Sequence, residues 1–298
     1  RSPSRGLGDV YKRQGMESIR SYRKKIGIEL QNLSTITARE AELEAQFILQ
    51  FVLKETSTQL IIGRNKKISE NDAGLIESIV KQRLLGTPLA YLFKEWDFYG
   101  RTYYINQQTL IPRQDTELMI DILIQNNKED SSLKILDLGT GSGVIGLTLA
   151  HHFFNAQITL SDISSEAIKV AKINGGNSGL KNIQFVESNW FEKIPPGKFD
   201  VIVSNPPYIP KNDKHLKHPE LLEQPQIALM SELGGLQAIT DIVKNAKQYL
   251  NKAGLLMIEH GFDQAPTVKN IFTANTFNNV RQYQDINSRI RITSGVKI

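Results

Sequence analysis

The sequence predicts an α/β fold: a mostly parallel β-sheet with helices on both faces, preceded by a small amino-terminal helical domain. Three observations support it. Apolar runs alternate with helical patterns from Leu133 onward, as in sheets built from strand-helix-strand units. Residues before position 88 show apolar positions at helical spacing only. The length of 298 residues suffices for one large core and a smaller one.

The chain divides into four parts in this interpretation. Residues 1–15 carry four Arg or Lys and one Asp, and we expect a tail that is not native, with Met16 as the true start. Residues 16–88 form the helical domain, which we expect to dock substrate, and residues 89–108 form a β-hairpin linker. Residues 109–298 form the sheet domain. No repeat or low-complexity segment is evident.

Helical stripes and caps define the amino-terminal domain. A capping box of Thr37 and Glu40 precedes the second stripe, Ser69 can cap a third helix, and Gly86 and Pro88 end that helix. The apolar stripes are, in order, Ile19, Tyr22, Ile26, Leu30 and Leu33; Leu43, Phe47, Ile48 and Phe51; and Leu75, Ile76, Ile79, Val80 and Leu84.

Aromatic residues around a Tyr-Gly pair predict a β-hairpin within residues 91–105. In the loop that follows, "LIPRQDTEL", Asp115 or Thr116 can cap the next helix. Five predicted strands then read "LKILDL", "QITLSD", "NIQFVE", "FDVIVS" and "GLLMIEH". Helices are predicted near 144–153, 164–174 and 235–250, and an antiparallel pair at 279–284 and 289–294 closes the sheet.

Composition removes several classes of function. With no cysteine, the chain has no disulfide, thiolate zinc site or cysteine nucleophile. No apolar run approaches the roughly 18 to 20 residues that span a bilayer, so we expect a soluble, cytoplasmic protein that binds no membrane. The net charge is +5, of which the first 15 residues hold +3 (four basic minus one acidic), leaving +2. That small remainder gives little support to nucleic-acid binding.

The segment "ILDLGTGSGVIGL" places Gly139, Gly141, Gly143 and Gly146 between a buried strand and a helix. Glycine allows positive φ there and lets a ligand approach the backbone. The spacing also fits a dinucleotide fingerprint, so the loop alone cannot separate NAD from S-adenosylmethionine. No Walker lysine follows, which excludes a P-loop.

Acidic and aromatic residues follow the strands at the same sheet edge. Asp137 can attract a cationic methionine group or anchor the loop. Asp162 ends the next strand and can accept hydrogen bonds from ribose hydroxyls or cap the helix near Ser164. Trp190 follows the third strand, where it can line an adenine pocket or belong to the core.

The most discriminating motif is "SNPPY" at the end of "FDVIVS". An amine on a carbonyl or aromatic carbon is a poor nucleophile, so a methyl transferase must align its lone pair by holding both N–H groups. The Asn205 side chain and the Pro206 carbonyl are two acceptors, fixed by the rigid Pro206 and Pro207. Tyr208 can stack on the planar group. No base is required before transfer, since the proton can leave afterwards.

With these motifs the chain resembles the release-factor glutamine methyltransferases, also called HemK or PrmC proteins. The resemblance covers nearly everything after Met16, including "GTPLAYL", "FYGR", "LIPRQDTE", "DLGTGSG", "VSNPPYIP" and "IEHGFDQ". It implies a seven-stranded, Rossmann-like class I methyltransferase domain. It also implies S-adenosylmethionine as donor, S-adenosylhomocysteine as product, and the glutamine of a Gly-Gly-Gln loop in peptide chain release factors as acceptor.

The resemblance also implies roles for residues. The cofactor would contact Gly139, Thr140, Gly141, Ser142 and Gly143 of the glycine loop together with Asp162, Trp190 and Asn205. Residues Asn205 to Tyr208 would hold the glutamine, and the "PRQDTE" loop would help to close the site.

Three positions depart from the family pattern: Gln114 replaces a usual proline, Asn189 a common aspartate, and Gln224 a frequent glutamate. They bear on closure around the cofactor and on a long polar loop predicted at 209–233. His215 and His218 in that loop lack a third ligand, so we expect no metal site.

Other functions remain open at this point. A methyltransferase with this motif can act on a glutamine of a ribosomal protein, or on the exocyclic amine of adenine in DNA. An NAD-dependent oxidoreductase or a non-catalytic binding protein can share the fold. The motif has no role in hydride transfer, and a cofactor-binding assay separates these classes.

Overall fold

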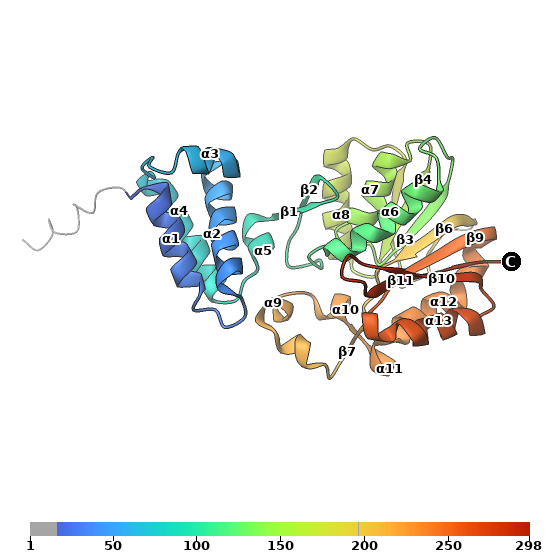
Figure 1. The fold of residues 1–298 in the computed structure, drawn as a ribbon. Helices are drawn as coiled ribbons and strands as arrows, with labels where there is room; N and C mark the ends of the chain where they lie inside the picture. The colour runs from blue at the N-terminus through green and yellow to red at the C-terminus, as the bar shows by residue number, and fades with distance from the viewer. Residues whose placement is uncertain (1–16, 196) are drawn as a thin grey trace, which may run out of the picture. The chain divides into compact units, whose positions relative to one another are not determined.

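The computed structural model describes residues 17–195 and 197–298, except the side chain of His215. The predicted tail at 1–15 and the start at Met16 lie outside these residues. The chain divides into two compact units between Phe93 and Lys94 (Figure 1).

The first unit contains five helices in its described part, and the predicted caps at Thr37 and Ser69 are confirmed. Ser18 and Thr56 cap two further helices through their side chains. The helices are α1 (Ile19–Leu30), α2 (Ala38–Leu53), α3 (Ser57–Ile62), α4 (Glu70–Leu84) and α5 (Leu89–Phe93).

The apolar stripe predicted on α2 is partly wrong. Leu43 is 43% exposed and Phe47 is 48% exposed, whereas Ile48 is fully buried. Small residues account for the difference, because Ala41 and Ala45 let α2 approach its neighbours closely and turn the larger side chains outward. The α1 and α4 stripes hold, apart from an exposed Leu75.

A buried ion pair ties α2 to α4. Arg83 is 1% exposed, and its Nε and Nη2 donate to the two carboxylate oxygens of Glu44 at 2.8 and 2.9 Å. A guanidinium can be buried when a carboxylate matches its fork-shaped donors in this way.

The predicted β-hairpin is present in the second unit as β1 (Glu95–Phe98) and β2 (Arg101–Tyr104). Tyr99 and Gly100 both have positive φ, the backbone of a two-residue hairpin turn. The boundaries differ from the predicted linker at 89–108. Helix α5 packs in the helical core, and the chain divides at residue 93, not 88, because Leu89 is buried in that core.

A seven-stranded sheet forms the centre of the second unit, in the order β10-β11-β9-β6-β3-β4-β5. The strands β9, β6, β3, β4 and β5 are parallel, while β11 runs antiparallel to both β9 and β10. This arrangement confirms the predicted fold class and closing pair. The bounds are β3 (Lys134–Leu138), β4 (Gln157–Asp162), β5 (Ile183–Glu187), β6 (Phe199–Ser204), β9 (Leu250–Glu259), β10 (Asn278–Gln284) and β11 (Ile290–Val296).

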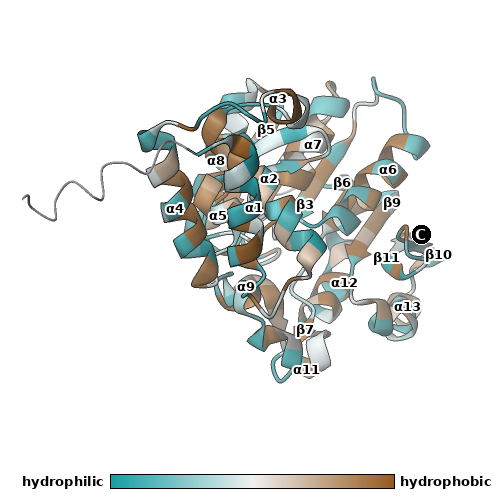
Figure 2. Cartoon of the chain, turned by 60° about the vertical axis from the view of Figure 1, so that its left-hand side comes forward, coloured by the Kyte–Doolittle hydropathy of each residue, from teal (hydrophilic) through white to brown (hydrophobic). Residues whose placement is uncertain are grey.

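Helices cover both faces of the sheet (Figure 1). One face carries α6 (Glu117–Asn126), α7 (Val144–His152) and α8 (Ser165–Ser178), and the other carries α12 (Gln237–Tyr249) and α13 (Ala265–Ala274). Hydrophobic residues run along β9 in Figure 2, where Leu256, Met257 and Ile258 are fully buried. No helix among the described residues is long and apolar enough to cross a membrane.

The segment predicted as a polar loop at 209–233 contains short helices. A two-residue strand lies on each side of residues 211–229, and these strands, β7 (Ile209–Pro210) and β8 (Met230–Ser231), pair in parallel. The short helices are η3 (Lys214–Lys217), α9 (Pro219–Leu222), α10 (Gln226–Leu229) and, after β8, α11 (Glu232–Gly235). We call residues 211–235 the lid segment. Two further 3-10 turns are η2 (Gln114–Thr116) and η4 (Phe262–Gln264).

The buried ion pair predicts a local loss of stability. Replacing Glu44 with alanine leaves the buried Arg83 guanidinium without its carboxylate, which costs about 3 kcal/mol in the free energy of unfolding. Hydrogen exchange of the full chain should show faster exchange within residues 17–93.

The exposed pair of Lys25 and Glu77, 3.5 Å apart, provides the control. Glu77→Ala should cost less than about 1 kcal/mol, since water screens that pair. Equal losses in both variants would contradict the distinction.

Candidate active site

A cavity of about 330 Å³ opens at the carboxyl ends of β3, β4 and β6. Loops after parallel strands meet at this edge, which is where doubly wound folds bind ligands. The glycine loop, Asp162, Trp190, Asn205 and Pro207 line it, together with part of the lid segment. The structure therefore brings together most of the residues that the sequence predicted.

The glycine loop needs its glycines. Gly139, Gly141 and Gly143 have φ of +70°, +56° and +87°, a region that disfavours side chains. At Gly146 a Cβ would lie 2.7 Å from the Leu160 side chain, so this position needs glycine for close helix packing.

Several N–H groups of the loop are already committed. Thr140 donates to the Ser161 carbonyl, Gly141 to Asp162, and Gly143 to the Thr140 carbonyl. These donors are therefore not offered to the pyrophosphate of a dinucleotide.

Asp137 anchors the loop from beneath. Its Oδ2 accepts from Thr140 Oγ1 at 2.6 Å and from the Gly146 N–H at 3.0 Å. The side chain is fully buried, and its Oδ1 has no hydrogen-bond partner among the described residues. Burial raises the pKa of Asp137 to about 7, although these two hydrogen bonds oppose the rise. Asp137 does not line the cavity, and its predicted contact with the cofactor stays a prediction.

Asp162 lies on the cavity wall at the end of β4. Its Oδ2 accepts from the Gly141 N–H and its Oδ1 from the Ser164 N–H, both at 2.9 Å. Burial raises its pKa, and these backbone donors act in the opposite direction. The predicted cap is wrong, because Ser164 itself caps α8 through its side chain, while Asp162 holds the turn before it. Asp162 lines the cavity, and its contact with a ribose stays a prediction.

Trp190 lies across the glycine loop. Its indole is 3.5 Å from the position that a Cβ on Gly139 would occupy, and the residue has a positive φ of +45°. The Ser188 hydroxyl donates to the Trp190 carbonyl at 3.0 Å and helps to hold this turn. The indole is therefore a wall of the cavity beside the loop.

Hydrogen bonds hold the side chains of the first two residues of the "SNPPY" motif, which begins at the end of β6. The Ser204 hydroxyl donates to the Leu138 carbonyl at 2.7 Å, and Asn205 Nδ2 donates to Thr116 Oγ1 at 3.1 Å. Neither Asn205 Oδ1 nor the Pro206 carbonyl accepts a hydrogen bond within residues 17–195 and 197–298. These two oxygens thus have no partner in the described part of the chain, and their role as acceptors for a planar amine stays a prediction.

Pro207 lies on the cavity wall, whereas Pro206 is buried and Tyr208 is half-buried beside the main core. The Tyr208 hydroxyl donates to Glu259 Oε1 at 3.4 Å, and its carbonyl accepts from Gln264 Nε2 at 2.9 Å. Burial and the nearby Glu259 carboxylate raise the pKa of Tyr208. Its predicted stacking role stays a prediction.

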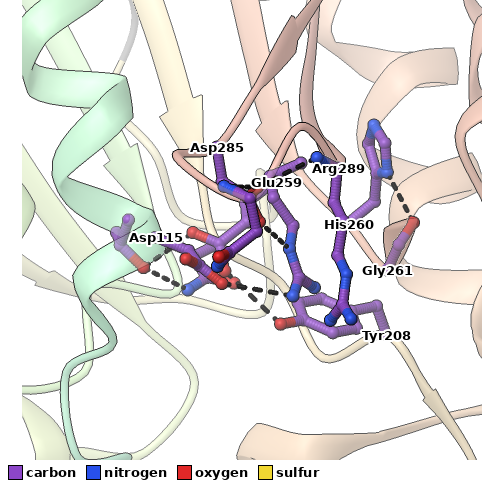
Figure 3. A network of polar contacts seen from close by, with 11 residues as sticks. Asp115, Tyr208, Glu259, His260, Gly261, Asp285 and Arg289 are labelled. Atoms are coloured by element: carbon purple, nitrogen blue, oxygen red, sulfur yellow. Dashed lines mark hydrogen bonds and ion pairs between the residues drawn. The ribbon is translucent and has the colours of Figure 1, made fainter.

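Sequence reasoning missed a polar network behind the motif (Figure 3). Thr116 Oγ1 donates to Glu259 Oε2 at 2.7 Å, so Thr116 does not cap α6 through its side chain as predicted. Asp115 does not cap it either, because it pairs with Arg291 Nη2 at 3.2 Å. Thr116 thus turns toward the buried Glu259 carboxylate, and Asp115 turns toward the half-buried Arg291 guanidinium.

Two of the three departures from the family pattern, Asn189 and Gln224, have hydrogen-bond partners. Gln114 begins η2, and Asn189 donates to Glu192 at 2.8 Å. Gln224 is buried, where its Oε1 accepts from the Ile111 N–H at 3.2 Å and its Nε2 donates to the Glu220 carbonyl. A neutral amide thus joins the lid segment to the loop before η2. No group of His, Cys, Asp and Glu able to hold a metal occurs in the described part of the chain.

Comparison with known proteins gives matches along most of the chain. A family model called PrmC N-terminal domain matches residues 31–93, and one called Methyltransferase small domain matches residues 114–287. The T. thermophilus 16S rRNA N2 G1207 methyltransferase, solved with AdoMet and guanosine, is 16% identical with a TM-score of 0.50. That match covers 68% of this chain and 50% of the other, and it bears on the fold alone.

Proteins found by sequence comparison share a higher identity with this chain than that solved structure does. The release factor glutamine methyltransferase of Buchnera aphidicola is 36% identical over 92% of this chain and 98% of that protein. The one from Coxiella burnetii is 33% identical over 91% and 96%. A bifunctional methyltransferase of Rickettsia typhi is 39% identical, and the match spans 54% of its length. This chain belongs to the release factor glutamine methyltransferase family.

Proposed function

We propose that the protein transfers the methyl group of S-adenosylmethionine to the side-chain nitrogen N5 of a glutamine in a peptide chain release factor. The glutamine is that of the Gly-Gly-Gln loop, and S-adenosylhomocysteine is the other product. The observation that carries the proposal is the fixed Asn205 side chain: its Nδ2 donates to Thr116, which leaves Oδ1 as an acceptor beside the cavity.

The chemistry of a glutamine amide explains why two acceptors are needed. The nitrogen lone pair is delocalised into the carbonyl group, so the nitrogen reacts only when that lone pair is aimed at the methyl carbon. One N–H can donate to Asn205 Oδ1 and the other to the Pro206 carbonyl. Alignment of this kind can supply several kcal/mol, up to about 7 to 11 in favourable cases. The proton leaves after transfer, so no base is needed beforehand.

The cavity fits S-adenosylmethionine. Asp162 offers carboxylate oxygens toward a ribose, Trp190 offers an indole face, and Gly141 has open space where a side chain would be. The bound cofactor supplies an electrophilic methyl group on a sulfonium. Asp137 lies beneath the loop with a buried Oδ1 that has no partner among the described residues, and we assign to it, directly or through a neighbour, the attraction of the cationic methionine portion. Thr140 and Ser142 belong to the same cavity wall.

We place the reaction in the cytoplasm, where translation terminates, and assign release-factor docking to the helical unit. A glutamine of a ribosomal protein and the exocyclic amine of adenine present the same geometry to Asn205. The names of the relatives and the matching PrmC N-terminal domain support the release factor. No direct nucleic-acid contact is proposed.

Labelled S-adenosylmethionine should transfer its methyl group to a purified release factor. Replacing the glutamine of the Gly-Gly-Gln loop should abolish labelling, since it is the only residue of the Gly-Gly-Gln motif with a side-chain amide. Ribosomal proteins and DNA serve as parallel substrates, and labelling of either in place of the release factor would overturn the assignment.

Asn205→Ala should lower kcat by about 100-fold to 1,000-fold, because one preorganised hydrogen-bond partner of the reacting group is lost. The dissociation constant for the cofactor, measured by calorimetry, should change far less. The exposed Asn155, which donates to the Asp130 carbonyl, gives a matched control in Asn155→Ala. Equal losses in kcat and cofactor affinity would count against Asn205 as the main aligner.

A further inference from the structure

Glu259 is a buried carboxylate directly behind the motif (Figure 3). It ends β9, is 1% exposed, and accepts hydrogen bonds at both of its oxygens. Thr116 Oγ1 donates to Oε2 at 2.7 Å, and the Tyr208 hydroxyl donates to Oε1 at 3.4 Å. A carboxylate without its proton can only accept, so both hydroxyl protons must point toward it.

The direction of these bonds fixes the Asn205 amide. The Thr116 hydroxyl has one proton, and that proton is given to Glu259. Toward Asn205 the Thr116 oxygen can therefore only accept, and it meets the Nδ2 group at 3.1 Å. Because the NH2 and carbonyl groups of an amide diverge from one carbon, Oδ1 is then the atom left for a ligand.

We infer that Glu259, acting through Thr116, is a positioning residue that selects which end of the Asn205 amide faces the substrate. The inference rests on the proposed function, in which the substrate offers two N–H donors. With the amide reversed, Asn205 would present its own N–H groups to the N–H groups of the glutamine. Two donors facing each other repel, and the lone pair of the substrate would lose its alignment.

Protonation of Glu259 would remove the preference for the Asn205 amide orientation in which Oδ1 faces the substrate. A protonated carboxyl can donate to Thr116 Oγ1, whose own proton can then point to Asn205 and favour the reversed amide. Burial raises the pKa of Glu259 to about 7, opposed by the Thr116 hydrogen bond. Asp115 from η2 raises this pKa further, while Arg291 from β11 and the Tyr208 hydroxyl lower it.

The ion pairs that Arg291 makes within the described residues are with carboxylates other than Glu259. Arg291 Nη2 pairs with Asp115 at 3.2 Å and its Nε with Asp285 at 3.1 Å. The positive charge is therefore shared among carboxylates, which is consistent with a Glu259 that titrates near neutral pH. Since the ionised form gives the productive amide, activity should rise as the pH increases through about 7.

The first test compares variants at pH 8 on the methylation of a release factor. Thr116→Val removes the acceptor for Asn205 and should lower kcat by up to about 100-fold, whereas Thr116→Ser keeps the hydroxyl and should recover most of it. Glu259→Gln leaves one acceptor oxygen for two hydroxyl donors and should lower kcat by at least about 10-fold. Cofactor affinity should stay near the wild-type value in all three.

Asp200→Asn is the matched control for the change from carboxylate to amide. Asp200 lies at the far end of β6, where it accepts from the Lys134 N–H at 2.9 Å and from Asn251 Nδ2 at 2.7 Å. Its kcat should remain close to wild type. If Thr116→Val keeps wild-type kcat, or if Thr116→Ser fails to restore it, the inference is wrong.

A pH series gives a readout that a merely structural role would not move. The kcat of the wild type should fall below about pH 7, and the kcat of Glu259→Gln should be low and independent of pH. An unchanged fall in Glu259→Gln would contradict the inference. If Glu259 acted instead as a general base, the wild type would show the same dependence of kcat on pH. Thr116→Val would then leave the activity intact.

Nuclear magnetic resonance of the side-chain amides tests the network without any protein substrate. The Asn205 NH2 signals, assigned by their loss in Asn205→Ala, should shift between pH 8 and pH 6 in wild type, and stay constant in Glu259→Gln. A shift in the wild type without release-factor methylation would support the network and reject the proposed substrate. An unshifted wild-type signal would reject the network itself.

Discussion

The hydrogen bond from Asn205 to Thr116 is the interaction on which the site depends. It commits the donor end of the amide to the protein and leaves the acceptor end beside the cavity. A planar NH2 group has only donors in its plane, so a site that aligns it must present acceptors and exclude donors. The prolines at 206 and 207 serve the same requirement, since neither has an N–H.

This requirement explains why distant parts of the chain meet behind the motif. The carboxylate of Glu259 at the end of β9 receives the Thr116 proton, and the Gln264 side chain holds the Tyr208 carbonyl. At Gly235 a Cβ would lie 2.1 Å from the same Tyr208 carbonyl, so the lid segment ends in contact with the motif backbone. The motif is therefore fixed from its side chains and from its backbone.

Local patterns in the sequence predicted the parts of the fold that depend on near neighbours. The capping box at Thr37, the turn at Tyr99 and Gly100, and the succession of strands and helices along the chain follow from residues a few positions apart. Local patterns did not predict which face of α2 is buried, because burial there depends on how closely Ala41 and Ala45 approach other helices. The Thr116 cap failed for a similar reason: its partner Glu259 is 143 residues away.

The glycine loop, Asp162, Trp190 and the motif could be placed at one sheet edge because parallel strands carry their following loops to the same side. The network behind them has no local signature. The most direct test of the central claim is a mass spectrum of the release-factor peptide after reaction with the enzyme and S-adenosylmethionine. The account predicts one added methyl group on the side-chain nitrogen of the Gly-Gly-Gln glutamine, and a methyl group on any other atom would contradict it.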